Sequence, residues 1–330
     1  MPEPKFLLIA AGLALSLAAP VRADIARAVE MQILPGYASL ATTTQALAEA
    51  TTESCDPAAI RPAYDAAFDA WMQVGHLRLG PGELAAITIA FWPDSRSATP
   101  RALNRMIADQ DPLGTDPAGY AQVSAAARGF FALDALVFDP EPAGDPAYRC
   151  ALTATVAADL AVQAKALDQD WREGFAATLT TAGEPGNSTY LAPEEAVQAL
   201  YTQLLAGLEF TEDQRLARPL DSFDKPHPKR AEAWRSARSL PNIRASLKAQ
   251  RALAVALADA PIPLTEAAFD AADAAADVVV DPGFQDIADA QAWFRADVLR
   301  QRVQAIRQAV ETELGAQLGV AAGFNSADGD

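Results

Sequence analysis

Apolar residues recur three and four positions apart along most of this chain. The clearest run extends from residue 287 to residue 318 and includes Ile287, Trp293, Val303 and Ile306. This spacing matches the 3.6 residues of a helical turn and predicts an amphipathic helix with one buried face. No stretch shows a sustained alternation of apolar and polar positions, which would be typical of strands. The pattern therefore predicts an all-α fold.

Asp-Pro pairs mark three predicted helix starts, at residues 56–57, 116–117 and 145–146. An aspartate side chain can cap the free N–H groups of a first turn, and proline is favoured at the first helical position. We expect helices over 56–77, 116–138 and 145–173. Apolar spacing predicts further helices over 24–51 with a kink at Pro35, and over 101–108, 193–210, 229–258 and 265–278.

Two interruptions organise this helical pattern. Gly, Pro, Ser and Thr gather between residues 180 and 192, which predicts a boundary between two helical bundles, 24–183 and 190–330. In the first half, residues 76–96 form a long segment of polar and aromatic residues, which predicts a loop. Loops often carry binding residues. The candidate ligand-contacting residues of this loop are Arg78, Trp92, Asp94 and Arg96.

Residues 1–23 have the features of a signal peptide. Lys5 precedes an apolar run that ends in Val21-Arg22-Ala23, a cleavage site with small residues at the required positions. The run is shorter than the roughly 20 residues that span a bilayer. No cysteine lies near the cleavage point, which disfavours a lipoprotein. We expect a mature chain from Asp24, without a transmembrane segment, in the periplasm or cell envelope.

Charge and cysteine content narrow the expected partners. The formal net charge of −17 disfavours binding to nucleic acid. Cys55 and Cys150 are the chain's two cysteines, and in an oxidising compartment they are expected to form a disulfide. Two buried free thiols are the alternative.

The chain has only two histidines, His76 and His227, which excludes a zinc site made of three histidines. His227 lies between two prolines in a predicted surface loop. His76 ends a predicted helix, and Glu83 or Asp134 could supply further metal ligands. The alternative is that His76 caps the last carbonyl groups of its helix.

Other polar residues have both a binding and a structural interpretation. Asp134 lies in an apolar helix, where a carboxylate needs a partner, either a metal or an interior arginine. Arg235, Arg238 and Asn242 are spaced three and four apart on one face of a predicted helix. They could hold an anion or pair with buried carboxylates, and the acidic composition favours pairing.

Residues 129–134 read Gly-Phe-Phe-Ala-Leu-Asp, which resembles the Gly-x-His-x-x-Glu motif of imelysin-like proteins. Further similar segments follow in the family's order: 64–81, 91–94, 234–239 and 323–330. The resemblance implies two helical bundles facing each other across a cleft and a periplasmic or outer-membrane location. It also implies an association with iron uptake and, for some members, metallopeptidase activity.

The chain departs from this motif at the residues that would carry chemistry. Phe131 replaces the histidine and cannot coordinate a metal, Asp134 replaces the glutamate, and Ala237 stands where glycine is usual. A metal site would then depend on His76, Glu83 and Asp134. One imidazole with oxygen ligands suits iron or manganese better than zinc.

We therefore expect a non-catalytic envelope protein that binds a metal, a ligand or an iron-uptake partner in its cleft. A metallopeptidase is the second hypothesis, with His76 as a metal ligand and Glu83 or Asp134 as general base. A purely structural or interaction module is the third.

Overall fold

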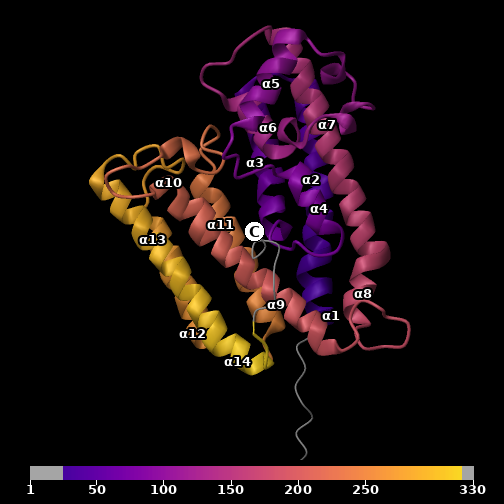
Figure 1. The fold of residues 1–330 in the computed structure, drawn as a ribbon, viewed down its shortest axis with the longest axis vertical. Coiled ribbons are helices and arrows are strands. Elements are labelled where there is room, and N and C mark those ends of the chain that lie inside the picture. Colours follow the sequence, from indigo (N-terminus) through magenta and orange to yellow (C-terminus); the bar gives the residue numbers. More distant parts are fainter. Residues whose placement is uncertain (1–24, 322–330) are drawn as a thin grey trace, which may run out of the picture.

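The computed structural model describes residues 25–321, and every regular element in this range is helical. The helices form two lobes that lie side by side (Figure 1). The all-α prediction is confirmed. The predicted signal peptide, residues 1–23, lies outside the described residues, which begin with α1 (Ile25–Ala28).

The first lobe is a bundle built around two long neighbouring helices, α2 (Leu34–Glu53) and α7 (Pro146–Asp170), with α3 (Pro57–Val74) against α2. The remaining helices of this lobe are α4 (Pro81–Ile89), α5 (Ala98–Asp109), α6 (Gly129–Phe138) and α8 (Ala176–Thr180).

The second lobe contains α9 (Pro193–Phe210), α10 (Arg218–Leu220), α11 (Ser239–Leu257), α12 (Pro263–Asp277), α13 (Ala290–Ala309) and α14 (Gly315–Leu318). Wider π-helical turns continue α1 into α2, α7 into α8, α9 into α10 and α13 into α14. Helix α11 packs on α3, so a single apolar core runs through both lobes. The division into two domains stays a prediction.

Two of the Asp-Pro pairs begin helices as predicted. Asp56 accepts a hydrogen bond from the Ala58 N–H at 3.0 Å, and Asp145 accepts one from the Ala147 N–H at 2.8 Å. The helix predicted over 116–138 is wrong in its first half, where residues 116–128 form turns and two short 3₁₀ helices, Tyr120–Gln122 and Ala125–Ala127. Gly129 begins α6 with φ +70°, and its Cα lies against the carbonyl groups of Thr88 and Ile89. This left-handed conformation separates the turns from α6.

Two further expectations need correction. The helix predicted over 229–258 begins only at Ser239, because Ala233 and Ala237 have φ of 45° and 58° and interrupt any helical path. Arg235 and Arg238 therefore precede the helix that holds Asn242. The long loop predicted over 76–96 contains α4, so its irregular backbone is limited to short segments on either side.

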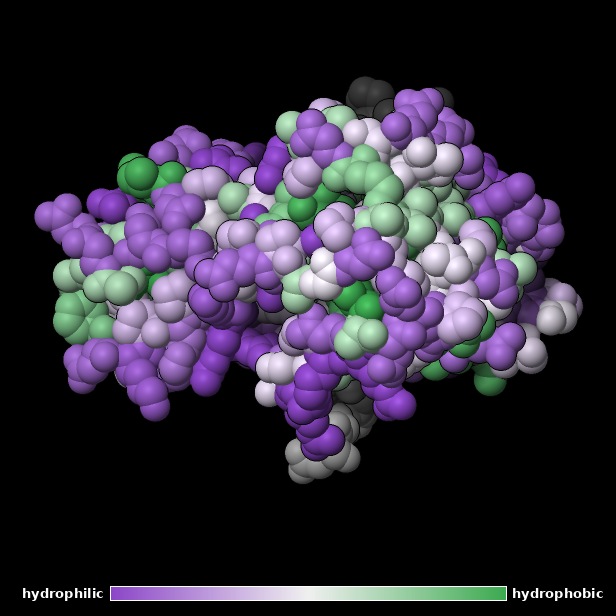
Figure 2. Space-filling model, turned by 90° about the horizontal axis from the view of Figure 1, so that it is seen from above, coloured by the Kyte–Doolittle hydropathy of each residue, from purple (hydrophilic) through white to green (hydrophobic). Residues whose placement is uncertain are grey.

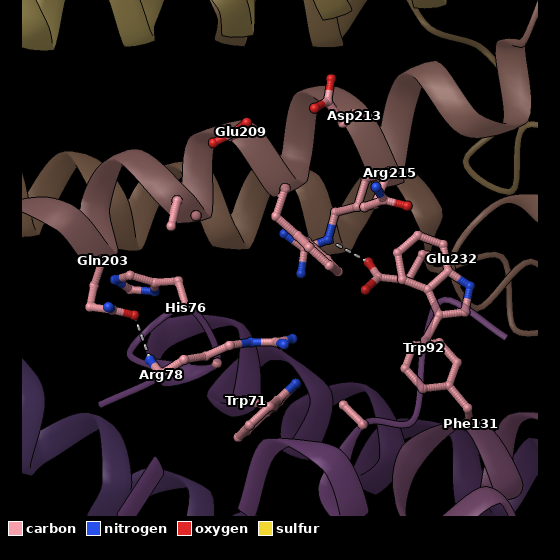
Figure 3. A pocket seen from close by; sticks show the side chains of 16 residues that line it. Trp71, His76, Arg78, Trp92, Phe131, Gln203, Glu209, Asp213, Arg215 and Glu232 are labelled. Atoms are coloured by element: carbon pink, nitrogen blue, oxygen red, sulfur yellow. Dashed lines mark hydrogen bonds and ion pairs between the residues drawn. The ribbon is translucent and has the colours of Figure 1, made fainter. Parts of the chain in front are cut away.

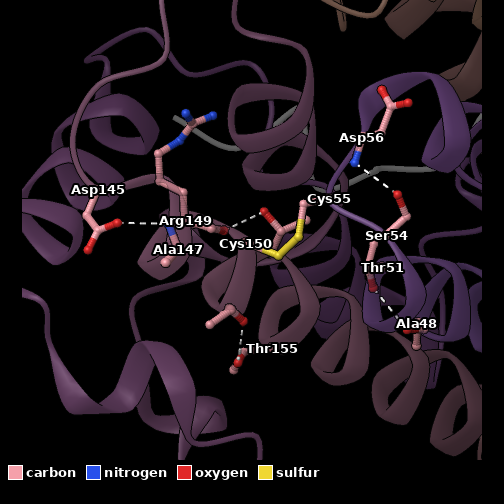
Figure 4. The surroundings of a disulfide bond; sticks show 12 residues. Ala48, Thr51, Ser54, Cys55, Asp56, Asp145, Ala147, Arg149, Cys150 and Thr155 are labelled. Carbon is pink, nitrogen blue, oxygen red and sulfur yellow. Dashed lines mark hydrogen bonds between the residues drawn. A yellow bond between two sulfur atoms is a disulfide. The ribbon is translucent and has the colours of Figure 1, made fainter.

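The predicted disulfide is confirmed. Cys55 follows α2 and Cys150 lies in the first turns of α7, with their Cα atoms 5.5 Å apart (Figure 4). The bond joins residues separated by 95 positions and ties the end of one central helix to the start of the other.

The continuous helix Pro146–Thr180 is the one described helix long and apolar enough to cross a membrane. In its most apolar window, 56% is buried inside the protein, where it packs against α2 and α6. Its apolar composition is that of a core helix.

Candidate functional site

A cleft of about 240 Å³ lies between the two lobes. Seen from above, the mostly hydrophilic surface is indented where the lobes meet (Figure 2). The first lobe contributes the end of α3 and its following loop, together with Trp92 and Phe131; the second contributes α9, its π turn and Glu232. Both lobes are therefore needed to form this site.

His76 lies at the inner wall of the cleft (Figure 3). The residue is buried, and neither ring nitrogen has a hydrogen-bond partner in the described part of the chain. Burial, together with the nearby Arg215 guanidinium, lowers the pKa of His76 to about 3. The imidazole is neutral at physiological pH, and both of its nitrogens are buried without a hydrogen-bond partner in this part of the chain. It does not cap α3, because its ring nitrogens make no such bond.

The structure does not bring the predicted metal ligands together. Glu83 is exposed on the first turn of α4, and Asp134 lies in α6 away from the wall that holds His76. Among residues 25–321, no group of three or more His, Cys, Asp or Glu side chains is arranged to hold a metal. Glu209 and Asp213 line the cleft, but their carboxylates point away from His76 (Figure 3).

Asp134 has protein partners instead. Its carboxylate accepts hydrogen bonds from the Ser236 N–H at 3.0 Å and the Ser236 hydroxyl at 2.6 Å, and Arg235 lies 3.7 Å away. Burial raises the pKa of Asp134, while the Ser236 bonds and Arg235 oppose that rise. The residue at the motif's glutamate position thus joins α6 to the segment before α11.

The motif's histidine position is part of an aromatic wall. Phe131 stacks on Trp92 with ring centroids 5.9 Å apart, and Trp92 meets the edge of Phe210 at 5.8 Å. Phe131 also contacts Phe68 behind it. Apolar rings therefore cover the place from which a metal-binding imidazole would project.

The predicted cleft residues near α11 are engaged within the protein. Arg238 forms an ion pair with Asp65 at 3.2 Å and a closer one with Asp69, and it donates to Asn242 at 3.0 Å. Asn242 in turn donates to Glu232 at 3.1 Å.

Arg235 pairs with Asp139 at 3.1 Å and lines a second cavity of about 320 Å³ that adjoins the cleft along Trp92. Asp94 lines the same cavity and accepts hydrogen bonds from the N–H groups of Ala98 and Thr99 at 2.7 and 2.8 Å, so it caps α5. Arg96 is exposed and lines none of the described cavities.

Arg78 does line the cleft, and three further arginines of this region were missed by sequence reasoning: Arg215, Arg218 and Arg230. Arg215 is buried and pairs with Glu232 at 2.8 Å. The available signal was a concentration of basic residues from 215 to 230 in an acidic chain, most of them between the helices predicted over 193–210 and 229–258.

An all-α fold of two helical lobes with a cleft between them defines the class of this protein. The sequence profile of the imelysin family matches residues 33–318, and the chain belongs to that family. An imelysin-like protein from Psychrobacter arcticum 273-4 has a similar structure, with a TM-score of 0.75, 16% identity, and coverage of 91% of this chain and 96% of that one.

A second similar structure is a protein from Parabacteroides distasonis ATCC 8503, described provisionally as an iron-regulated protein A precursor. The TM-score is 0.67 at 15% identity, with 88% of this chain and 95% of that one covered. At these identities the comparisons establish the shared fold. Among curated proteins, none matches this chain significantly.

Proposed function

We propose that this protein is an exported, non-catalytic binding protein that holds a ligand in the cleft between its lobes and serves iron uptake. The aromatic wall carries the proposal: where a catalytic motif would supply an imidazole, Phe131 stacks on Trp92. The neighbouring carboxylate of Asp134 is occupied by Ser236. A hydrolytic metal centre has no ligand set at this place, whereas a cleft walled by rings and hydrogen-bonding groups suits binding.

Export is supported by two independent features. Residues 1–23 have the charge and apolar pattern of a signal peptide. The Cys55–Cys150 disulfide joins two core helices, and structural disulfides persist in oxidising compartments such as the periplasm.

The connection with iron comes from the resemblance to imelysin-like proteins and from the similar structure described as an iron-regulated protein A precursor. The ligand would be iron itself, manganese in its place, or a molecule that carries iron. His76 offers a neutral imidazole at the inner wall for any of these.

Calorimetric titration of the mature protein tests this function. The probes are Fe³⁺, Mn²⁺ and ferric citrate, and each is repeated on Ala206→Phe, which fills the cleft. Val162→Phe is the matched control, because Val162 is 69% exposed on α7 and lies outside the cleft. We expect at least one probe to bind the wild type and Val162→Phe with equal affinity. The affinity of Ala206→Phe for that probe should be at least tenfold lower.

Two results would contradict the proposal. One is that the wild type cleaves a denatured protein substrate, that a chelator abolishes this activity, and that His76→Ala does not have it. This result would establish the metallopeptidase. The other is the absence of binding of any probe to the wild type, which would leave a structural or interaction module.

A further inference from the structure

Three arginines from separate segments gather at the mouth of the cleft. Arg78 follows α3, Arg218 begins α10, and Arg230 ends the 3₁₀ turn Pro228–Arg230. They line one open cavity of about 700 Å³ whose other polar lining residues are Ser95 and Gln214. No carboxylate lines this cavity, although the chain as a whole has a net charge of −17. The mouth is thus a local positive region in an acidic protein.

Two of these guanidinium groups, those of Arg78 and Arg218, form no ion pair with a carboxylate within 4 Å among residues 25–321. Arg78 lies over the ring of Phe210, 5.4 Å from its centroid, and Arg218 lies over Trp92 at 5.7 Å. Most other partly buried arginines of this region pair with a carboxylate, as Arg215 does with Glu232. Arg230 has only a half-exposed contact with Asp221 at 3.4 Å.

The positive groups also act on one another. Burial and then Arg215 lower the pKa of Arg78, and Glu232 opposes this only in part. Burial and then Arg230 lower the pKa of Arg218, and Asp94 opposes this only in part. Partly desolvated cations that face like charges are stabilised when an anion enters between them. Arginine is the side chain best shaped to hold carboxylate or phosphate oxygens through two parallel hydrogen bonds.

We propose that the mouth of the cleft binds a multivalent oxyanion, with Arg78 of the first lobe and Arg218 of the second gripping carboxylate or phosphate groups from opposite sides. Arg230 adds charge at the outer edge, and the rings of Trp92 and Phe210 flank the bound group. This inference rests on the proposed function, since it specifies the ligand of the same cleft. Iron would then enter as an anionic chelate and not as a bare cation.

The decisive experiment is calorimetric titration of the mature protein with citrate, pyrophosphate, ferric citrate and Mn²⁺. The test variant is Arg78→Gln/Arg218→Gln. The control variant Arg105→Gln/Arg302→Gln removes the same charge from exposed positions on α5 and α13, away from the cleft. Citrate and pyrophosphate distinguish a carboxylate ligand from a phosphate ligand.

We expect at least one oxyanion to bind the wild type and the control equally, and to bind the test variant at least tenfold more weakly. Equal weakening in both variants would overturn the site, because general charge would then explain the binding. Binding of Mn²⁺ without any oxyanion would overturn the inference but keep the proposed function. If no probe binds, both fail. Circular dichroism of each variant confirms that it is folded.

Discussion

Replacing His76 with glutamine should remove a specific pH dependence from the stability of this protein. The folded-state pKa of His76 is about 3, against an ordinary value of 6.5, because the ring is buried and faces Arg215. Between these two pH values the unfolded chain binds a proton that the folded protein does not. The free energy of unfolding is therefore unaffected by the titration of His76 above pH 6.5 and decreases as the pH falls from 6.5 toward 3.

The size of the effect follows from the two pKa values. Each unit of pH within the window changes the free energy of unfolding by about 1.4 kcal/mol. From pH 7 to pH 5 most of 1.5 units are crossed, so His76 should lower stability by about 2 kcal/mol. The same comparison cancels the contributions of the cleft's other charged groups, which remain in both proteins: Arg78, Glu209, Asp213, Arg215 and Glu232.

The assay is urea unfolding of the wild type and His76→Gln at several pH values from 7.5 to 5. The glutamine shifts the absolute stability at every pH, so the readout is the change in the difference between the two proteins. We expect the wild type to lose about 2 kcal/mol more than the variant over this range. Proton NMR gives a second measurement, since the His76 ring resonance should not titrate above pH 5. Parallel stability curves, or a resonance that titrates near 6.5, would refute the reasoning.

Three further predictions concern stability. Asp134→Ala leaves the buried N–H and hydroxyl of Ser236 without their acceptor and should lower the free energy of unfolding by about 3–5 kcal/mol. A double-mutant cycle with Ser236→Ala should show a coupling energy of at least about 1 kcal/mol, and additive losses would disprove the link. Gly129→Ala places a Cβ against carbonyl groups at φ +70° and should lower the free energy of unfolding by more than about 2 kcal/mol in thermal melts. The control Gly174→Ala has open space at its Cβ and should change the free energy of unfolding by less than about 1 kcal/mol. Reducing the disulfide, which joins residues 95 positions apart, should lower the free energy of unfolding by about 4–5 kcal/mol; an unchanged urea midpoint would contradict this.

The helices whose signals are local were predicted well. The helix at 193–210 has the predicted bounds, and Asp56 and Asp145 cap their helices as Asp-Pro pairs should. Apolar period and capping act within a few residues, so one sequence is enough to reveal them. The helices over 116–128 and 229–238 were wrongly predicted, and positive φ at Gly129 and Ala237 separates these segments from the helices that follow. An alanine at position 237 carries no local signal of that conformation.

The candidate site shows the same division. The sequence alone determined the all-α class and the loss of the motif's imidazole at Phe131, since both follow from residue type and local spacing. It favoured a disulfide between the two cysteines, and the structure decided for that pairing against two free thiols. Only the tertiary structure decided that Asp134 pairs with Ser236 instead of joining His76, because the two lie on different walls. It also decided that Arg78 and Arg218, far apart in the chain, line one cavity that no carboxylate lines. Partners across long sequence separations depend on how helices pack, and hydrophobic burial fixes that packing without regard to the polar groups it brings together.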